Sequence, residues 1–234
     1  MKLRGDTTAI TTPGQFINIK LDGHFLRRPI SVNDVEYGTR GNDGCVTIIY
    51  KVLGHGTEEM TRFEPGRELD VLTGLGNGYD LSLAGDRPLL IGGGVGIPPL
   101  YLAAKRLAKV GRKTTVILGF NSAKELHSNT AFKALGCDVI VATADGSLGI
   151  KGFVTDAFDP SGDYTHFYTC GPEPMLRAVY DKVYKEAGIS GQMSFEERMG
   201  CGFGACMGCS CKTVTGYKRI CKDGPVMFTE EILW

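Results

Sequence analysis

The first third of the chain alternates apolar and polar positions over short stretches. Residues 15–21 (QFINIKL) and 45–52 (CVTIIYKV) have a period of two, and residues 68–72 (ELDVL) form a shorter run of the same kind. This period places alternate side chains on opposite faces of an extended strand, and turn-forming residues separate the runs. Several short strands at this spacing predict a small antiparallel β-barrel over residues 1–84.

From about residue 86 the pattern changes to buried apolar runs that alternate with helical spacing. It predicts strands over residues 88–91, 114–120, 138–142 and 166–170, and helices over residues 97–110, 124–135 and 174–187. Such alternation is typical of a doubly wound parallel α/β sheet. We expect this α/β domain to span residues 85–189 and a small cysteine-rich module to span residues 190–234. The predicted fold class is therefore multi-domain α+β.

Composition and charge narrow the range of partners and locations. The formal net charge is zero, with 26 basic and 26 acidic residues. This balance creates no overall field that would attract nucleic acid or an anionic membrane, so we expect neither as a partner. The longest apolar stretch, residues 87–102, is interrupted by glycine and proline, and the first ten residues predict no signal peptide. Eight cysteines in such a chain favour a reducing, cytoplasmic location and metal binding.

Five of the eight cysteines fall in the last forty residues. Cys201, Cys206 and Cys209 have the spacing C-x4-C-x2-C, and Cys221 follows after eleven residues. This is the opening of the plant-type ferredoxin pattern, in which four thiolates hold a 2Fe–2S cluster. Three glycines lie between the first three cysteines and allow backbone N–H groups to approach the cluster sulfurs. We expect the fourth ligand to be Cys221, on a following strand.

Zinc and disulfide formation are the alternatives at these cysteines. Zinc could bind Cys206, Cys209 and Cys221 tetrahedrally, but zinc sites of this kind usually pair two short C-x2-C hooks and only one is present. A disulfide framework suits small secreted domains, and this chain is longer and lacks a secretory signal. We expect Cys211, two residues after Cys209, to point the other way and to stay outside the ligand set.

A glycine-rich segment directly follows a predicted buried strand and opens a helix. It is formed by Gly92, Gly93, Gly94, Gly96 and Pro98. A nucleotide pyrophosphate can bind helix N–H groups at such a position. The segment departs from G-x-G-x-x-G, because the third glycine position holds proline, and a simple tight turn is the alternative.

A second candidate segment, TCGPEPM (residues 169–175), ends a later parallel strand. Its candidate residues are Cys170, Gly171, Pro172 and Met175. Ligands of parallel sheets bind outside the carboxyl ends of the strands, whereas the alternative is an ordinary helix start with proline in its first turn. The occurrence of both segments in one sheet favours a binding site.

The barrel region holds a weaker signal. Arg27 and Arg28 precede Pro29, Ile30 and Ser31, and an arginine beside a restricted proline can hold a phosphate. Paired arginines are more often solvated, because exposed charge is the default. The four histidines of the chain lie near no plausible nucleophile in the sequence, so we assign no acid–base catalyst.

Together these segments resemble the ferredoxin reductase-like flavoprotein family. The resemblance rests on RRPISV (27–32), GGGVGIPPLY (92–101) and TCGPEPM (169–175). Within that family the chain is most similar to electron-transfer subunits of class 1B (NAD-dependent) dihydroorotate dehydrogenases. That closer resemblance rests on EERMGCGFGACMGCSCKT (196–213), RICKDGPVMF (219–228), DGSLGIKGFVTD (145–156) and ILGFNS (117–122).

The resemblance implies three cofactors and a partner. FAD is expected in the barrel domain, held by Arg28, Pro29, Ile30, Ser31, Ile49, Tyr50, Lys51, Gly56 and Thr57. A 2Fe–2S cluster is expected on Cys201, Cys206, Cys209 and Cys221, and NAD on the α/β domain. The partner is an FMN-containing catalytic subunit that oxidises dihydroorotate to orotate in pyrimidine biosynthesis, as a heterotetramer of two plus two. Electrons would pass from that FMN through the cluster and FAD to NAD.

Two other interpretations of the sequence compete with this one, the first from the same superfamily and the second from another class of protein. The flavin subunit of an NADH-dependent ferredoxin:NADP oxidoreductase or of a sulfide dehydrogenase has a similar tail, but its first cluster ligand is typically aspartate. Here that position is Cys201, which favours the dihydroorotate system. The other reading, a non-enzymatic zinc scaffold, would lack visible absorption. The family also carries an additional N-terminal strand, and this sequence starts after it, so we expect either an incompletely closed barrel or a misassigned start codon.

Overall fold

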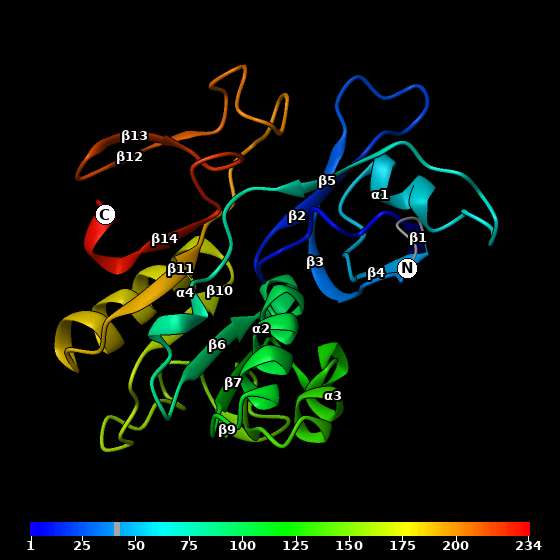
Figure 1. Cartoon of the computed structure of the whole chain (residues 1–234). Coiled ribbons are helices and arrows are strands. Elements are labelled where there is room, and N and C mark those ends of the chain that lie inside the picture. Colours follow the sequence, from blue (N-terminus) through cyan, green and yellow to red (C-terminus); the bar gives the residue numbers. More distant parts are fainter. Residues whose placement is uncertain (40–42) are drawn as a thin grey trace.

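The computed structural model describes residues 1–39 and 43–234, which form two lobes and a C-terminal extension. The predicted fold class is confirmed: one lobe is an antiparallel sheet and the other is a mostly parallel sheet with helices on both faces (Figure 1). Among the described residues, no helix has the length and apolar character needed to cross a membrane.

In the described part of the chain, the antiparallel sheet has the strand order β1-β4-β3-β2-β5. The strands are β1 (Lys2–Gly5), β2 (Phe16–Ile19), β3 (Arg28–Glu36), β4 (Gly44–Ile48) and β5 (Val71–Leu75), and α1 (His55–Met60) follows β4. Ile17 and Ile19 face the core of this lobe, which also buries Val32, Val46 and Ile48. The period-two pattern thus identified β2 and β4, but not β3, the nine-residue strand that contributes Val32 and that runs through the turn expected at Asn33 and Asp34.

The edges of this sheet differ from the sequence prediction in two places. The strand predicted at 68–72 is displaced and runs from Val71 to Leu75, with Gly74 at a φ of +65°. A register irregularity in the pairing of β2 with β5 accompanies it. The strand β1 was not predicted; it pairs with β4, and among the described residues no pairing joins it to β5, so the sheet is a half-barrel.

The parallel sheet has the order β14-β11-β10-β6-β7-β8-β9 within the described residues. Its strands are β6 (Leu89–Gly93), β7 (Thr115–Phe120), β8 (Asp138–Thr143), β9 (Ile150–Lys151), β10 (Phe167–Cys170), β11 (Gly191–Ser194) and the antiparallel β14 (Val226–Phe228). Its helices are α2 (Pro98–Lys109), α3 (Asn129–Ala134) and α4 (Glu173–Val179). All four strands and the first helix predicted for this domain lie within a few residues of their predicted places.

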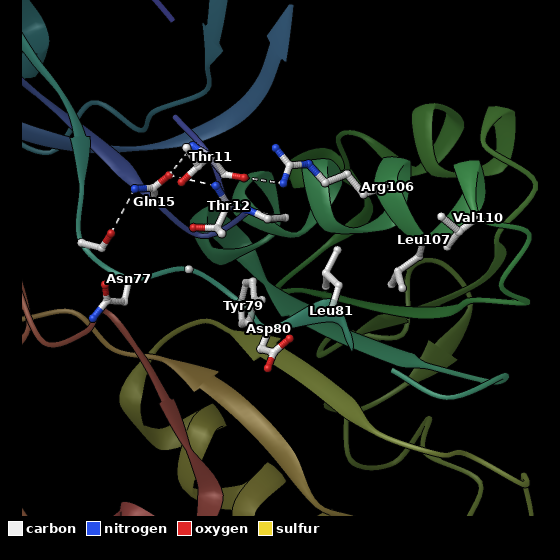
Figure 2. A pocket seen from close by; sticks show the side chains of 13 residues that line it. Thr11, Thr12, Gln15, Asn77, Tyr79, Asp80, Leu81, Arg106, Leu107 and Val110 are labelled. Carbon is white, nitrogen blue, oxygen red and sulfur yellow. Dashed lines mark hydrogen bonds between the residues drawn. The ribbon is translucent and has the colours of Figure 1, made fainter. Parts of the chain in front are cut away.

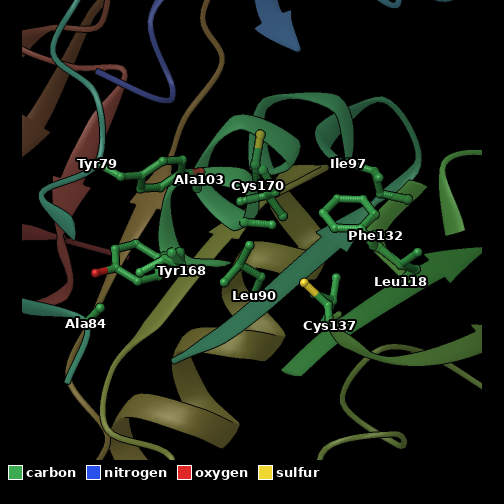
Figure 3. Close-up of a cluster of buried hydrophobic side chains, with 14 of the residues drawn as sticks. Tyr79, Ala84, Leu90, Ile97, Ala103, Leu118, Phe132, Cys137, Tyr168 and Cys170 are labelled. Carbon is green, nitrogen blue, oxygen red and sulfur yellow. The ribbon is translucent and has the colours of Figure 1, made fainter. Parts of the chain in front are cut away.

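Alternate side chains of these strands build two cores. Leu90, Val116 and Tyr168 pack on one face beneath α2 and α3 (Figure 3). Leu89 and Ile117 pack on the opposite face together with residues of α4. Because both faces are covered, the strands are apolar throughout, as is typical of parallel sheets.

Two predicted helices are less regular than expected. The helix predicted at 124–135 is wrong, because a 3-10 turn at Ala123–Glu125 is separated from α3 by Ser128, whose φ is +65°. A non-glycine residue in this left-handed conformation interrupts helical hydrogen bonding. The helix predicted at 174–187 starts as α4 and continues as a π-helix over Tyr180–Glu186.

Most of the last forty-five residues join the second lobe. Strand β11 pairs with β10 and β14 pairs with β11, so the two strands extend the parallel sheet at one edge. Only the hairpin β12 (Ser210–Thr213) and β13 (Gly216–Arg219) stands apart, at the cysteine-rich extension (Figure 1). The three domain ranges given above stay predictions.

Helix α2 joins the two lobes. Leu102 packs in the barrel core, and Lys105 Nζ lies 2.8 Å from both carboxylate oxygens of Asp34 on β3. Arg106 Nη1 donates to the Thr11 carbonyl at 2.6 Å, beside a cleft of about 640 Å³ (Figure 2). Gln15, which lines the same cleft, donates to the Gly76 carbonyl and accepts from two backbone N–H groups. The polar groups of Arg106 and Gln15 thus make their hydrogen bonds within the protein. We therefore interpret this cleft as part of the contact between the two lobes.

Candidate functional site

The two predicted nicotinamide segments lie against each other at the carboxyl ends of two neighbouring parallel strands. Strands β6 and β10 are neighbours, and Gly92 is opposite Cys170. A Cβ atom added to Gly96 would lie 2.3 Å from the Cys170 carbonyl oxygen, and one added to Gly93 would lie 2.4 Å from Met175 Sδ. Only glycine permits this approach, so the glycines fix the position of one segment on the other.

The outer side of the glycine segment is open. Gly94 has a φ of +53°, and a Cβ atom added there would meet nothing within 4 Å. Helix α2 begins directly afterwards, with Pro98 and Pro99 in its first turn. Pro98 and Pro99 carry no N–H, and the N–H groups of Ile97 and Leu100 donate to the Gly94 and Ile97 carbonyls. A phosphate here would therefore be favoured by the open backbone at Gly94 and by the dipole of the twelve-residue helix.

A second cleft lies between the lobes on the predicted flavin side. It is lined by Phe16, Pro29, Ile30, Ser31, Ile49, Tyr50, Lys51, Leu53, Val95, Cys170, Ser194, Phe195, Glu196, Glu197, Met199 and Pro225. The structure thus brings residues 29–31 and 49–51, predicted from separate parts of the barrel, together with Cys170 of the other lobe. Residues 194–199 were missed, although they directly follow β11 and thus the carboxyl end of a parallel strand.

Cys170 forms part of the wall between the two candidate sites. Burial, and to a lesser degree Glu196, raise the pKa of its thiol to about 12, against the opposing effect of a hydrogen bond with Ser194. The thiol is therefore neutral at physiological pH.

Arg28 and Gly56 lie together at the edge of the barrel. Arg28 Nη2 is 2.7 Å from His24 Nδ1, and His24 Nε2 is 3.0 Å from a Glu59 carboxylate oxygen. A Cβ atom added to Gly56 would lie 2.3 Å from Arg28 Nε. Two residues that the resemblance joined are thus adjacent, and a partly exposed guanidinium held in this way can bind a phosphate.

Thr57, the other predicted FAD contact beside Gly56, uses its side chain within the loop that precedes α1. Its Oγ1 accepts hydrogen bonds from the Leu53 N–H at 2.9 Å and the Gly54 N–H at 3.2 Å. The hydroxyl also donates to the Gly54 carbonyl at 3.0 Å. Thr57 therefore shapes the loop before α1 through its side chain.

The four predicted cluster cysteines form two pairs. The backbone N–H of Cys201 lies 3.4 Å from Cys206 Sγ, and the N–H of Cys206 lies 3.4 Å from Cys201 Sγ. In the second pair the N–H of Cys221 lies 3.4 Å from Cys209 Sγ. Within residues 1–39 and 43–234, no three potential metal ligands converge on one point.

The environment of the thiols fits a cluster. Burial alone would raise the pKa of the Cys201 thiol, but backbone N–H groups of the following loop, that of Cys206 first, lower it to about 6. Burial and the contact with Cys209 raise the pKa of Cys221 to about 12. Two thiol pairs with N–H groups aimed at their sulfurs suit a 2Fe–2S centre, in which each iron binds two protein ligands. A single zinc ion would instead need all its ligands around one point.

Two expectations for the cysteines are wrong. Cys211 does not point away from the cluster region; it packs against the apolar group that contains Cys209 and Cys221. The reason is that residues two apart on an extended segment share a face. Cys221 lies in the turn after β13, not on a strand, and Arg219 ties this turn to the first loop by binding Asp223 and the Gly204 carbonyl.

The flavin-side cleft and the cysteine pairs share a wall. Phe16 on β2 lines the cleft and also packs with Cys209 and Cys221. The backbone N–H of Asn77, after β5, donates to the Gly224 carbonyl at 2.6 Å, which anchors the end of the cysteine segment on the barrel lobe. The candidate nicotinamide, flavin and cluster sites are therefore contiguous.

Two family models match this chain. One is described as the iron-sulfur cluster binding domain of dihydroorotate dehydrogenase B and matches residues 196–233. The other is described as the oxidoreductase NAD-binding domain and matches residues 90–181. The first covers the four candidate ligand cysteines, and the second covers both candidate nicotinamide segments.

Solved structures agree with the fold. A structure described as the NADH-dependent reduced ferredoxin-NADP oxidoreductase has a TM-score of 0.85 and 30% identity, covering all of this chain and 84% of that one. The flavohem-like FAD/NAD binding domain of a Vibrio cholerae nitric oxide dioxygenase has a TM-score of 0.64 at 20% identity, over 81% and 87% of the two chains. The second likeness shows the fold alone.

Curated relatives are more similar in sequence. A protein of Fusobacterium nucleatum described as dihydroorotate dehydrogenase B (NAD(+)), electron transfer subunit, is 44% identical over 99% of this chain and 91% of its own length. A Bacillus pumilus protein of the same description is 42% identical over the same shares. These values exceed the 30% identity to the ferredoxin-NADP oxidoreductase, so the alternative assignment is not favoured. The chain therefore belongs to the family of electron transfer subunits of dihydroorotate dehydrogenase B (NAD(+)).

Proposed function

We propose that this chain carries electrons from the FMN of a dihydroorotate dehydrogenase subunit through a 2Fe–2S cluster and FAD to NAD. The proposal rests on the observation that the three candidate sites are adjacent. Cys170 lies between the nicotinamide and flavin sites, and Phe16 lies between the flavin cleft and the cluster cysteines. Electron transfer between redox groups requires them to be close, whereas hydride transfer requires positioning more than acid–base chemistry.

The barrel lobe holds FAD in this proposal. Residues 29–31 and 49–51 line the cleft for the flavin ring, and Arg28 beside Gly56 binds the phosphates. Bound FAD supplies the exchange between a two-electron hydride carrier and a one-electron cluster. Cys170 and the glycine segment would hold the nicotinamide beside the flavin cleft, and the open backbone at Gly94 would bind the NAD pyrophosphate, favoured by the dipole of α2.

The cysteine segment holds the cluster. Cys201 and Cys206 bind one iron, and Cys209 and Cys221 bind the other, in accordance with their pairing. The loop amides stabilise the negative charge of the thiolates and the cluster. Four thiolates and no histidine ligand are typical of plant-type 2Fe–2S centres.

The relatives are named as subunits, and a catalytic subunit with FMN is accordingly the partner of this chain. The assembly is a heterotetramer of two copies of each subunit, in the cytoplasm. The test is to purify this chain together with a dihydroorotate dehydrogenase B catalytic subunit and to measure NAD reduction that depends on dihydroorotate. Failure of the purified, cofactor-loaded pair to reduce NAD would contradict the proposed function.

Arg28 provides a specific test of FAD binding. We expect Arg28→Ala to weaken FAD binding about ten- to a hundredfold, because a charge-assisted contact with phosphate contributes about 1.5–3 kcal/mol. The cluster absorption should persist. The measurement is FAD fluorescence released on dilution, with Arg62→Ala, at an exposed position on the same lobe, as the control. Unchanged FAD retention would show that Arg28 is only a surface charge.

A further inference from the structure

Asn18 occupies an unusual place on strand β2. Residues two apart on a strand share a face, so Asn18 lies on the face of Phe16, which packs with Cys209 and Cys221. Ile17 and Ile19 point the opposite way, into the barrel core. Asn18 therefore stands where the flavin-binding lobe meets the cysteine segment, although the two are more than 180 residues apart in sequence.

The contact of Asn18 with the cysteine segment is direct. Its Nδ2 donates to the carbonyl oxygen of Cys201 at 3.4 Å. Gly202 has a φ of +78°, and a Cβ atom added to it would lie 2.2 Å from the same Nδ2. The glycine after the first cluster ligand is thus required both by its backbone conformation and by the side chain of Asn18.

A purely structural role does not account for this asparagine. Its side chain is only 1% exposed, and its Oδ1 has no hydrogen-bond partner in the described part of the chain. An unpaired buried amide oxygen is costly, and an apolar side chain of similar volume would avoid that cost. If Asn18 served only to pack the barrel, leucine would do at least as well.

We propose that Asn18 is a positioning residue that fixes the first cluster ligand to the flavin-binding lobe and raises the reduction potential of the cluster. In a trans peptide the carbonyl and the following N–H point in opposite directions. With its carbonyl held by Asn18, the Cys201–Gly202 peptide turns its N–H away from Asn18, and Cys201 is kept where the Ala205 and Cys206 N–H groups reach its Sγ at 3.2 and 3.4 Å. Such N–H groups raise cluster potentials by stabilising the more negative reduced state. The inference rests on the ligand set proposed above.

The test compares Asn18→Leu and Asn18→Asp with the wild-type protein loaded with FAD and cluster. Both variants remove the N–H donor, and the aspartate also places a carboxylate against the Cys201 carbonyl. We expect iron release to a chelator to accelerate about fivefold in the leucine variant, the effect of one lost hydrogen bond, and more in the aspartate variant. The cluster midpoint potential, measured by redox titration, should fall in both.

Asn33→Leu is the matched control, because Asn33 is also a buried asparagine of this lobe, on the strand that packs against α2. It should leave iron release and potential unchanged. Circular dichroism and FAD content establish folding. The inference is overturned if both Asn18 variants keep the wild-type midpoint potential of the cluster. This holds when iron release stays at the wild-type rate and also when it rises only because the variants unfold. Absence of the cluster from the wild-type protein would instead overturn the ligand set itself.

Discussion

Replacing Cys221 by serine should abolish the visible absorption of the iron–sulfur cluster, and so should the same change at Cys201, Cys206 or Cys209. This is the largest effect we expect from any single substitution, because each thiolate supplies half of the protein ligands of one iron. Serine keeps the shape of the side chain but replaces a soft thiolate by a poorly ionised hydroxyl. The measurements are the absorption spectrum and the iron content of the purified variants, with FAD content as a check on folding.

Cys211→Ser is the control for this series. Cys211 packs beside Cys209 and Cys221, yet it takes part in neither of the two sulfur pairs. We expect the cluster to persist in this variant. A cluster that is lost with Cys211→Ser and retained with Cys221→Ser would reverse the assignment of the fourth ligand.

The choice of Cys201, Cys206, Cys209 and Cys221 as ligands rests on their spacing, which is a local property of the sequence. In the structure Cys201 and Cys206 approach each other within one loop, whereas Cys209 approaches Cys221. The orientation of Cys211 was predicted wrongly, although strand alternation predicts a shared face with Cys209. The pairing of Cys209 with Cys221 depends on the hairpin β12–β13 that separates them, and this hairpin was not predicted.

The flavin-side cleft was predictable only in part. Residues 29–31 and 49–51 belong to recognisable segments, whereas residues 194–199 line the cleft only because β11 pairs with β10. That pairing joins segments far apart in the chain, and a hydrophobic pattern carries no information about which strands become neighbours. The contact of Asn18 with Cys201 depends in the same way on how the lobes and the cysteine segment pack.

Replacing Phe203 by glutamate should uncouple this subunit from its partner without affecting its own flavin chemistry. Met199, Phe203 and Met207 all flank the ligands, but only Met199 packs in the apolar core around Cys209 and Cys221. Phe203 is 55% exposed and Met207 is 52% exposed. Two large apolar side chains exposed on the cluster loop favour a protein interface, since a one-electron relay is useful only if it connects two redox groups.

A charge placed in such an interface loses its solvation without gaining a partner. We therefore expect Phe203→Glu to reduce NAD formation from dihydroorotate in the mixed complex by about tenfold or more, equivalent to about 1.4 kcal/mol or more of binding. NADH-driven reduction of an artificial dye by the same variant should stay at the wild-type rate. Val110→Glu, which places the same charge at another exposed apolar position, at the end of α2, is the control and should leave both activities intact.

The isolated chain should pass electrons from NADH to the dye but should not oxidise dihydroorotate. We assigned it no base that would take a proton from that substrate, and hydride transfer to FAD needs none. Dihydroorotate turnover by the isolated chain would contradict this division of labour. If Phe203→Glu lowers dye reduction as much as dihydroorotate oxidation, Phe203 supports the cluster itself and the exposed loop is not the contact with the partner.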